Sequence, residues 1–305
     1  MKVHSQSKRS FNSPSGAGGK IIVTGSNGQL GSELKELASH HSEADFIFFT
    51  RNELSIVDDA ALQNVFELHQ PNYFINCAAY TAVDKAEEEK ELASEINGTA
   101  VGAIANLCQQ NNCRLIHIST DYVFDGLANK PLKESDEVDP VNAYGESKLL
   151  GEQLALKNNP DTIIIRTSWV YSSYGKNFVK TMMRLMKEKE SIGVVSDQIG
   201  SPTYAADLAQ AILQIITSEK WVRGIYNYSN EGVISWFDFA TEIKSLINAS
   251  CIVNPITTSQ FPIPAKRPAY SVLDKTKIQN TFNITLKDWK ESLRVCVDKL
   301  MQTAN

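Results

Sequence analysis

The amino-acid sequence predicts an α/β fold in which a doubly wound parallel sheet is joined to a smaller C-terminal cap. From Lys20 onward, short runs of β-branched and aromatic residues alternate with longer segments whose apolar residues recur every three or four positions. This is the pattern of parallel strands joined by crossover helices. Several of the short runs are apolar nearly throughout, as in strands covered by helices on both faces. Strands are expected at residues 20–25, 46–50, 73–78, 114–119, 162–167 and 192–195.

The segments between these strands predict the helices. Helices are expected at 29–40, 58–69, 87–111, 142–157, 175–189 and 204–217, with a break inside 87–111. After about residue 220 the pattern changes to short strands, proline-containing loops and helices around 235–247 and 286–301. We therefore expect a disordered tail, a sheet domain and a discontinuous cap. Their bounds are 1–19 for the tail, 20–168 plus about 192–220 for the sheet domain, and about 169–191 plus 221–305 for the cap.

The composition excludes several classes of protein. Of 305 residues, 42 % are hydrophobic and 21 % charged, the balance of a globular chain. A net charge of -5 gives no basic field for nucleic acid or an anionic membrane. No apolar run could span a membrane and residues 1–19 lack the apolar part of a secretion signal, so a cytoplasmic protein is expected. The five cysteines form no CxxC pair and the histidines no HxxxH pair, so no metal is expected.

A glycine loop follows the first expected strand. Glycines stand at 25, 28 and 31, directly between the strand that ends at Thr24 and a helical pattern. Gly25, Gly28 and Gly31 allow a tight turn, a close approach of backbone N–H groups to a pyrophosphate, and close packing of helix on strand. The positive end of the helix then faces the phosphates. The sheet domain is therefore predicted to be a Rossmann-type nucleotide-binding domain, and the longer first gap between the glycines favours the short-chain dehydrogenase/reductase group.

The end of the second strand bears on the choice of cofactor. An acidic residue there would accept the ribose hydroxyls of NAD, whereas this strand ends in Thr50 and Arg51. A cationic end suits a 2′-phosphate, so NADPH is preferred and NADH stays open; Arg51 as a solvated surface residue is the alternative. Asp58 lies where a carboxylate could meet the adenine amino group, or it could cap the following helix.

Three polar residues form a candidate catalytic set. Tyr144 and Lys148 are four residues apart in a helical pattern, so both project from one helix face. Thr120 ends the fourth strand, at the sheet edge where ligands of open α/β sheets bind. A nearby ammonium and a cationic nicotinamide would lower the pKa of the tyrosine, whose usual value is about 10. Tyr144 is therefore the expected proton donor, and the Thr120 hydroxyl can polarise a carbonyl beside it.

Longer segments carry a family resemblance. They are TGSNGQLG (24–31), NCAAYTAVDKAE (76–87), ISTDYVFDG (118–126), AYGESK (143–148), RTSWVY (166–171), DQIGSPTYAADLA (197–209) and KRPAYSVLD (266–274). Together they resemble the dTDP-4-dehydrorhamnose reductases, a family of extended short-chain dehydrogenase/reductases, over essentially all of residues 20–305. The resemblance implies reduction of the C4 keto group of dTDP-4-dehydro-L-rhamnose to dTDP-L-rhamnose by NADPH or NADH.

The resemblance also implies site residues. In these roles Tyr144 protonates the developing alkoxide, Lys148 lowers its pKa and holds the nicotinamide ribose, and Thr120 bonds the sugar oxygen. The cofactor-binding residues are expected to be Gly25, Asn27, Gly28, Gln29, Leu30, Gly31, Arg51, Asp58, Ala78, Ala79, Tyr80, Tyr144 and Lys148. The residues expected toward the sugar nucleotide are Thr120, Tyr122, Phe124, Trp169, Asn177 and Arg267. Core packing is the alternative for Trp169, and a solvated loop charge is the alternative for Arg267.

One residue separates this chain from related dehydratases, and two other functions are weighed against the reductase. Sugar 4,6-dehydratases of this superfamily carry an acidic residue two places after the catalytic threonine, where this chain has Tyr122, so dehydration is disfavoured. The same fold and much of the same sequence recur in the NADP-binding regulatory subunit of methionine adenosyltransferase, which is the main alternative. A redox-sensing NADPH-binding protein is disfavoured because a sensor needs no positioned acid. The expected partner is the dTDP-sugar substrate, and a homodimer stays open.

Overall fold

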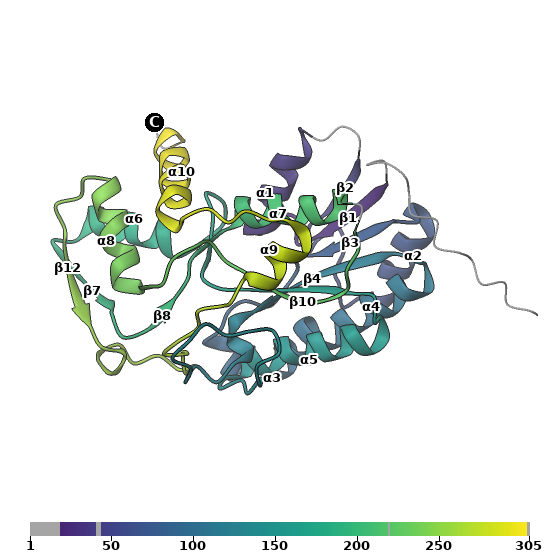
Figure 1. The fold of residues 1–305 in the computed structure, drawn as a ribbon, viewed down its shortest axis with the longest axis horizontal. Helices are drawn as coiled ribbons and strands as arrows, with labels where there is room; N and C mark the ends of the chain where they lie inside the picture. Colours follow the sequence, from purple (N-terminus) through teal and green to yellow (C-terminus); the bar gives the residue numbers. More distant parts are fainter. Residues whose placement is uncertain (1–18, 41–43, 219, 304–305) are drawn as a thin grey trace, which may run out of the picture.

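A six-stranded parallel sheet forms the centre of the larger lobe. The computed structural model describes residues 19–40, 44–218 and 220–303, so residues 1–18 of the expected tail lie outside the described residues. The strand order is β10-β5-β4-β3-β1-β2, and every pairing is parallel. The strands are β1 (Lys20–Thr24), β2 (Asp45–Phe49), β3 (Tyr73–Asn76), β4 (Arg114–Thr120), β5 (Ile163–Thr167) and β10 (Gly224–Tyr228). The predicted doubly wound α/β fold is confirmed (Figure 1).

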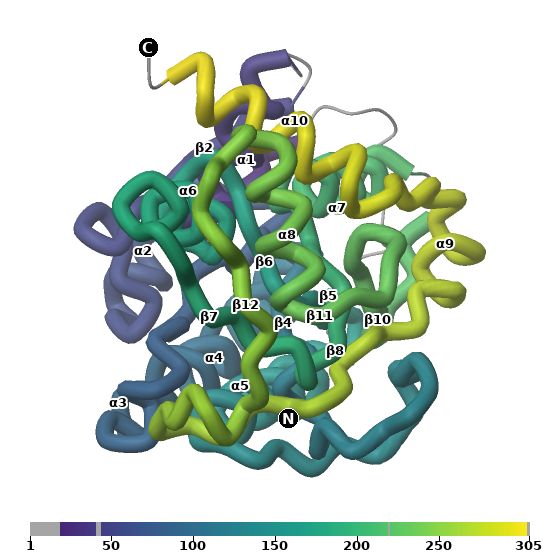
Figure 2. Tube along the Cα trace, turned by 90° about the vertical axis from the view of Figure 1, so that its left-hand side faces the viewer, coloured from purple at the N-terminus to yellow at the C-terminus, as the bar shows by residue number. Residues whose placement is uncertain are grey.

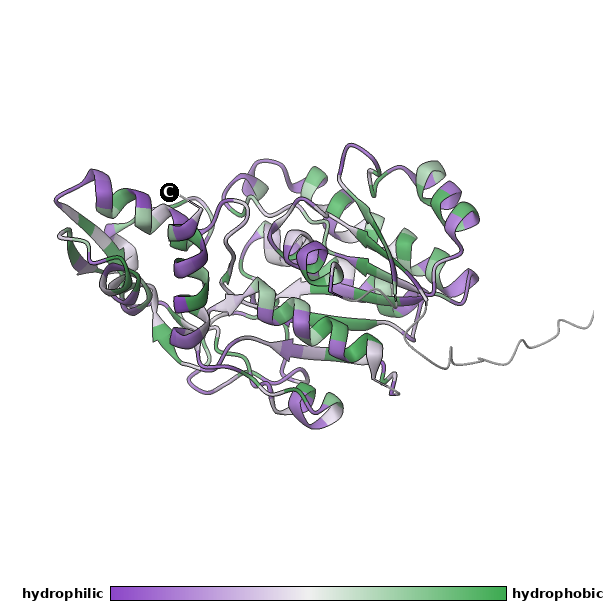
Figure 3. Cartoon of the chain, turned by 90° about the horizontal axis from the view of Figure 1, so that it is seen from above, coloured by the Kyte–Doolittle hydropathy of each residue, from purple (hydrophilic) through white to green (hydrophobic). Residues whose placement is uncertain are grey.

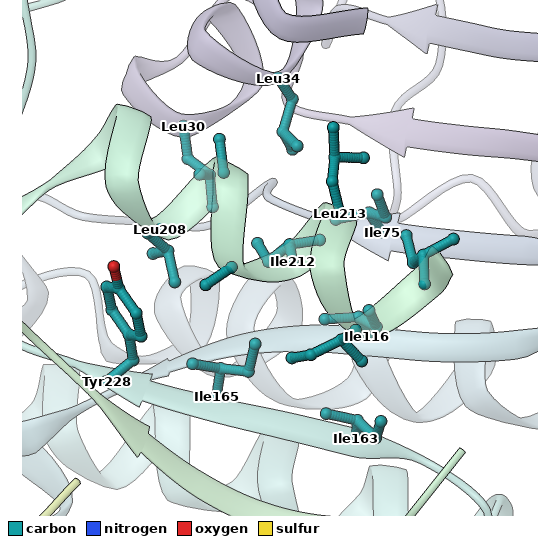
Figure 4. Packing of buried hydrophobic residues seen from close by; sticks show 14 of the residues in the cluster. Leu30, Leu34, Ile75, Ile116, Ile163, Ile165, Leu208, Ile212, Leu213 and Tyr228 are labelled. Atoms are coloured by element: carbon teal, nitrogen blue, oxygen red, sulfur yellow. The ribbon is translucent and has the colours of Figure 1, made fainter. Parts of the chain in front are cut away.

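Helices cover both faces of this sheet because alternate strand residues point to opposite sides. On one side Ile21 and Val23 pack with α1 (Gln29–Ala38), α7 (Ala205–Thr217) and α9 (Thr276–Phe282). Figure 4 shows Leu30 and Leu34 of α1 and Leu208, Ile212 and Leu213 of α7 gathered with the strand residues Ile75, Ile116, Ile163 and Ile165. On the other side Ile22 packs with α2 (Asp59–His69), α4 (Ala100–Gln110) and α5 (Ala143–Asn158).

One expected strand pairs elsewhere. The run expected as a sheet strand at 192–195 lies in β7 (Ser191–Val195), which pairs in parallel with β12 (Ile252–Ile256) in a separate two-stranded sheet. The sixth strand of the main sheet is instead β10, which we expected in the cap and which pairs with β5. The physical reason is burial, since Tyr226 and Tyr228 of β10 lie in the core, whereas β7 alternates exposed and buried residues. We accordingly propose a nucleotide-binding domain that includes β10 and a cap that includes β7.

The break expected inside 87–111 is a π-helical turn. Helix α3 (Lys90–Ser94) continues through the π-turn Glu95–Thr99 into α4 without a loop. The turn buries Asn97, whose side chain bonds the backbone N–H and C=O of Tyr80 at 2.9 Å each. A π-turn of this kind is common next to functional sites, and this one fixes the loop after β3.

The smaller lobe is built on three helices and short paired strands. Its helices are α6 (Phe178–Glu188), α8 (Trp236–Leu246) and α10 (Trp289–Gln302). Its short strands, besides β7 and β12, are β6 (Val170–Tyr171), β8 (Ile199–Gly200), β9 (Thr203–Tyr204) and β11 (Ile234–Ser235). They enclose a second core with Tyr171, Phe239 and Trp289 at its centre. Figure 2 looks onto this lobe, and Figure 3 shows hydrophobic residues concentrated in the strands and inner helix faces. Among the described residues no helix is long and apolar enough to cross a membrane.

A buried ion pair ties α5 to β5. The two guanidinium nitrogens Nε and Nη2 of Arg166 donate to the two carboxylate oxygens of Glu152 at 2.9 and 2.7 Å. Both side chains are nearly inaccessible, and Ser119 also donates to Glu152 at 2.5 Å. Removing one partner of such a pair leaves an uncompensated buried charge, which is more costly than the pair itself is stabilising.

We predict that Arg166→Met lowers the free energy of unfolding by about 3–5 kcal/mol, because Glu152 loses its buried counter-charge. Urea unfolding followed by circular dichroism measures the change. The control is Arg184→Met, which breaks an exposed pair with Glu188 (59 % and 52 % exposed) and should cost less than about 1 kcal/mol. Equal effects of the two substitutions would contradict the structural importance of the buried pair.

Candidate active site

The glycine loop forms a tight turn at the carboxyl end of β1. Gly25 adopts φ +68°, a left-handed conformation that glycine favours. The N–H of Gly28 donates to the Gly25 carbonyl at 2.9 Å. A Cβ on Gly31 would lie 2.6 Å from the Ser26 Cα, so only glycine lets α1 start this close to the strand. Gly28 is the N-cap of α1 and offers no side-chain cap, which leaves the first N–H groups of the helix available to a ligand.

A long cleft of about 560 Å³ opens above this turn. The predicted cofactor residues that line it are Gly25, Asn27, Gly28, Gln29, Arg51, Ala78, Ala79 and Tyr80. A glycine cradle at one side and the Arg51 cation at another fit a dinucleotide, whose phosphates need N–H donors and positive charge. Leu30 instead lines the neighbouring cavity, and Gly31 packs within the turn.

Asp58 does not line the cleft. Its carboxylate accepts a hydrogen bond from the Ala61 N–H at 3.0 Å and caps α2. The structure shows the cap that was the alternative for Asp58, because a side chain at the N-cap turns toward its own helix. The contact with adenine stays a prediction. The residues just before it, Ser55, Ile56 and Val57, line the cleft in its place.

Sequence reasoning also missed Gly175 and Lys176 in the wall of the cleft. They lie in the loop between β6 and α6, and a Cβ on Gly175 would lie 3.1 Å from the Gln29 side chain. No local motif marks them, since only the tertiary contact of this loop with α1 brings them to the cleft.

A second cavity of about 340 Å³ adjoins the cleft and brings the predicted catalytic set together. Thr120, Tyr144 and Lys148 all line it. The cavity shares Gln29, Cys77, Ala79 and Thr81 with the cofactor cleft. A cofactor in the first space would therefore lie beside a substrate in the second. Among the described residues no group of three or more His, Cys, Asp or Glu side chains could hold a metal ion.

The hydroxyl of Thr120 is held from two sides. It donates to the Asp121 carboxylate at 3.0 Å and accepts from the Tyr122 N–H at 3.2 Å. Asp121 is buried, and its other carboxylate oxygen has no partner. Burial raises the pKa of Asp121 to about 6. Asp121 is a cavity residue that sequence reasoning missed, although it stands next to the predicted threonine.

Tyr144 and Lys148 differ from the expected electrostatics. Burial, with a smaller effect of the Asp121 charge, raises the pKa of Tyr144 to about 12. Burial outweighs the lowering expected from Lys148, whose ammonium donates to the Ile118 carbonyl at 2.7 Å and whose own pKa is lowered by burial to about 8. The phenol consequently holds its proton, as a proton donor must.

Two tryptophans form the far wall of the catalytic cavity. Trp169 stacks on Trp236 with ring centroids 3.6 Å apart, and both line the cavity. Trp169 has φ +49°, a strained conformation for a large side chain. A Cβ on Gly200 would lie 2.6 Å from the Trp169 ring, so glycine is needed behind it. The indole of Trp169 thus lines the cavity and also packs against the core of the smaller lobe.

Two residues expected toward the sugar nucleotide instead pack in a core cluster and cap a helix. Phe124 is buried in a small core cluster beneath Arg166, whose guanidinium lies 5.0 Å from the ring centre. Asn177 is the N-cap of α6: its Oδ1 accepts from the Lys180 N–H at 3.1 Å and its Nδ2 donates to Gln29 at 3.0 Å. Neither lines a described cavity, because packing and capping turn both side chains inward.

Arg267 and Tyr122 lie at a third cavity of about 250 Å³, between the two lobes. One guanidinium nitrogen of Arg267 donates to Asp84 at 2.9 Å, and the group lies 5.8 Å from the Tyr122 ring centre. Its other terminal nitrogen, Nη1, is buried without a partner. Tyr122 also lines the catalytic cavity, so the two spaces adjoin at this side chain.

Nine-tenths of the chain matches proteins of one family. The family model of the RmlD substrate binding domain matches residues 19–302. The dTDP-4-dehydrorhamnose reductase of Aggregatibacter actinomycetemcomitans is 41 % identical over 90 % of this chain and 97 % of its own. Solved structures of dTDP-4-dehydrorhamnose reductases from Clostridium acetobutylicum, and from Bacillus anthracis in complex with NADP, superpose with TM-scores of 0.89 and 0.88. Each is 41 % identical to this chain and covers 92 % of it and 99 % of the solved chain. The chain therefore belongs to the RmlD family of dTDP-4-dehydrorhamnose reductases.

Proposed function

We propose that this chain reduces the C4 keto group of dTDP-4-dehydro-L-rhamnose to the hydroxyl of dTDP-L-rhamnose. The observation that carries the proposal is the single cavity lined by Thr120, Tyr144 and Lys148, which adjoins the glycine-loop cleft. A keto reduction needs a hydride donor on one side of the carbonyl and a proton donor at its oxygen. The two adjoining spaces supply places for both. The relative from Bacillus anthracis contains NADP, which supports a nicotinamide cofactor here.

Residues of the glycine loop and of the catalytic cavity would have separate roles in this reduction. Gly25, Gly28 and the start of α1 would hold the pyrophosphate, and Arg51 would face the adenosine end. When bound, the reduced nicotinamide supplies the hydride. Tyr144, whose phenol is protonated, donates its proton to the oxygen at C4. Thr120 bonds the same oxygen, and Trp169 and Trp236 would line the space that the sugar occupies.

The first test removes the proposed acid. Tyr144→Phe should lower kcat about 10²–10⁴-fold, because the oxygen at C4 loses its proton donor. NADPH oxidation at the nicotinamide absorbance, with and without the keto sugar, measures it, and cofactor affinity should be retained. The control Tyr226→Phe removes a hydroxyl bonded to the Val222 carbonyl outside the site and should leave kcat unchanged. Full activity of the Tyr144 variant would rule out this mechanism.

The second test concerns the cofactor. Arg51→Ala should weaken NADPH binding about tenfold, because a charge-assisted contact to the 2′-phosphate is lost. NADH lacks this phosphate and serves as the internal control, since its dissociation constant should not change. Titration by intrinsic fluorescence gives both constants. Equal effects on the two cofactors would assign Arg51 to the solvated surface instead.

The third test concerns the sugar nucleotide. The partnerless Nη1 of Arg267 supports a contact with the substrate diphosphate. Arg267→Met should therefore raise KM about tenfold or more with a smaller change in kcat. Arg184→Met, at an exposed site on α6, is the control for loss of one positive charge. An unchanged KM would assign Arg267 to a structural pair with Asp84.

The regulatory alternative predicts a different result. If wild-type protein bound NADPH and captured a methionine adenosyltransferase subunit but never reduced the keto sugar, the enzymatic proposal would fail.

A homodimer and a cytoplasmic location remain predictions, and light scattering on the purified protein tests the first of them.

A further inference from the structure

A buried row of polar side chains runs from the glycine-loop strand to Lys148. The Thr24 hydroxyl donates to Asn76 Oδ1 at 2.8 Å, Asn76 Nδ2 lies 3.2 Å from His117 Nδ1, and His117 Nε2 lies 3.3 Å from Lys148 Nζ. All four residues are at most 2 % exposed. Asn76 and His117 have no part in the reduction described above, so the row needs its own explanation.

The direction of every hydrogen bond in this row can be assigned. The Ala78 N–H can only donate, and it donates to Asn76 Oδ1 at 3.2 Å, as does the Thr24 hydroxyl. The oxygen of the Asn76 amide is therefore fixed, and its NH₂ group must face His117. Because an NH₂ group only donates, His117 Nδ1 must accept.

A neutral imidazole that accepts at Nδ1 carries its hydrogen on Nε2. Burial and the charge of Lys148 lower the pKa of His117 well below its usual value, which keeps the ring neutral. His117 therefore presents an N–H donor to Lys148 Nζ. An ammonium has three donors and no acceptor, whereas a neutral amine has one lone pair. The contact is a hydrogen bond only when Lys148 is neutral.

We propose that Asn76 and His117 are positioning residues that stabilise the neutral amine of Lys148, so that Lys148 can return a proton to Tyr144 after each reduction. Once Tyr144 has protonated the sugar oxygen, an N–H bond of the Lys148 ammonium breaks, the proton passes through the cavity that both residues line, and an O–H bond forms at Tyr144. The lone pair left on Nζ then accepts the His117 Nε2–H, and water later reprotonates the amine. The return of the proton to Tyr144 rests on the proposed reductase function.

The other titratable groups around Lys148 do not reverse the preference for its neutral amine. Glu152 on the same helix raises the pKa of Lys148, but it is itself bonded to Arg166, and burial has the larger effect. Tyr144, Cys77 and Asp121 line the same cavity. Burial raises the pKa of the Cys77 thiol to about 12, so it stays neutral. His117 is the one ring that faces Lys148 among the described contacts.

The tautomer of His117 can be observed without any turnover. In wild-type protein labelled with ¹⁵N-histidine, the two-bond ¹⁵N–¹H NMR spectrum should show a pyrrole-like Nε2 and a pyridine-like Nδ1 at His117, unchanged from about pH 5 to 9. His117→Asn assigns the signal by its loss. A proton on Nδ1, or a ring that titrates in this range, would overturn the inference even if the reductase function holds.

The pH profile tests the consequence for Lys148. Asn76→Asp replaces the NH₂ donor by an acceptor, which should move the proton of His117 to Nδ1 and turn Nε2 into an acceptor for the Lys148 ammonium. The alkaline limb of kcat/KM should then move up by about one pH unit or more, and His117→Phe should move it in the same direction. Thr24→Val removes only the outer bond, since Ala78 still orients Asn76, and should leave the limb in place.

Each outcome is decisive. Alkaline limbs that coincide for wild type, Asn76→Asp and His117→Phe would overturn the role in catalysis. If a variant does not fold, the NMR spectrum of the wild type still decides the tautomer. A wild type that lacks keto-sugar reduction but shows the Nε2–H tautomer would count against the proposed function and not against the state of Lys148.

Discussion

The parallel orientation of the main sheet is the constraint on which the site depends. Because β1, β3 and β4 run in the same direction, their carboxyl ends meet at one edge, and the chain must leave each strand there. The glycine turn follows β1 and Thr120 ends β4, so the phosphate cradle and the catalytic cavity become neighbours. The bond from Thr24 to Asn76 locks the ends of β1 and β3 together at this edge. A single topological choice thus brings distant segments into one site.

Local signals were sufficient where a function depends on a local turn. The glycine loop could be read from the sequence because its spacing dictates a strand, a turn and a helix in immediate succession. Tyr144 and Lys148 share a cavity because four residues make about one helical turn. The expected substrate residues that line no described cavity have the opposite property. Phe124 and Asn177 have suitable side chains, but their directions are set by a core cluster and a helix cap that the sequence does not display.

Long-range pairing was the other limit of prediction. The runs that form β7 and β10 are both rich in residues that favour strands. Neither run contains a signal that specifies which strand it pairs with. The partners follow from which residues the rest of the chain can bury, and the tyrosines of β10 fill the core between β5 and α9. Lys176 and Gly175 reach the cofactor cleft for the same kind of reason, through the contact of their loop with α1. Such residues become visible only when the fold is known.

Burial sets the protonation states of the site more strongly than any single charge does. It raises the pKa of Tyr144 and lowers the pKa of Lys148, so both move toward their neutral forms. A neutral phenol can donate its proton. A lysine that holds its own proton tightly cannot then reprotonate the tyrosine. The weakened hold of Lys148 on its proton is therefore useful, and the amide of Asn76 explains how a neighbouring imidazole can favour it. Hydrogen-bond direction, rather than charge, then controls the return of the proton.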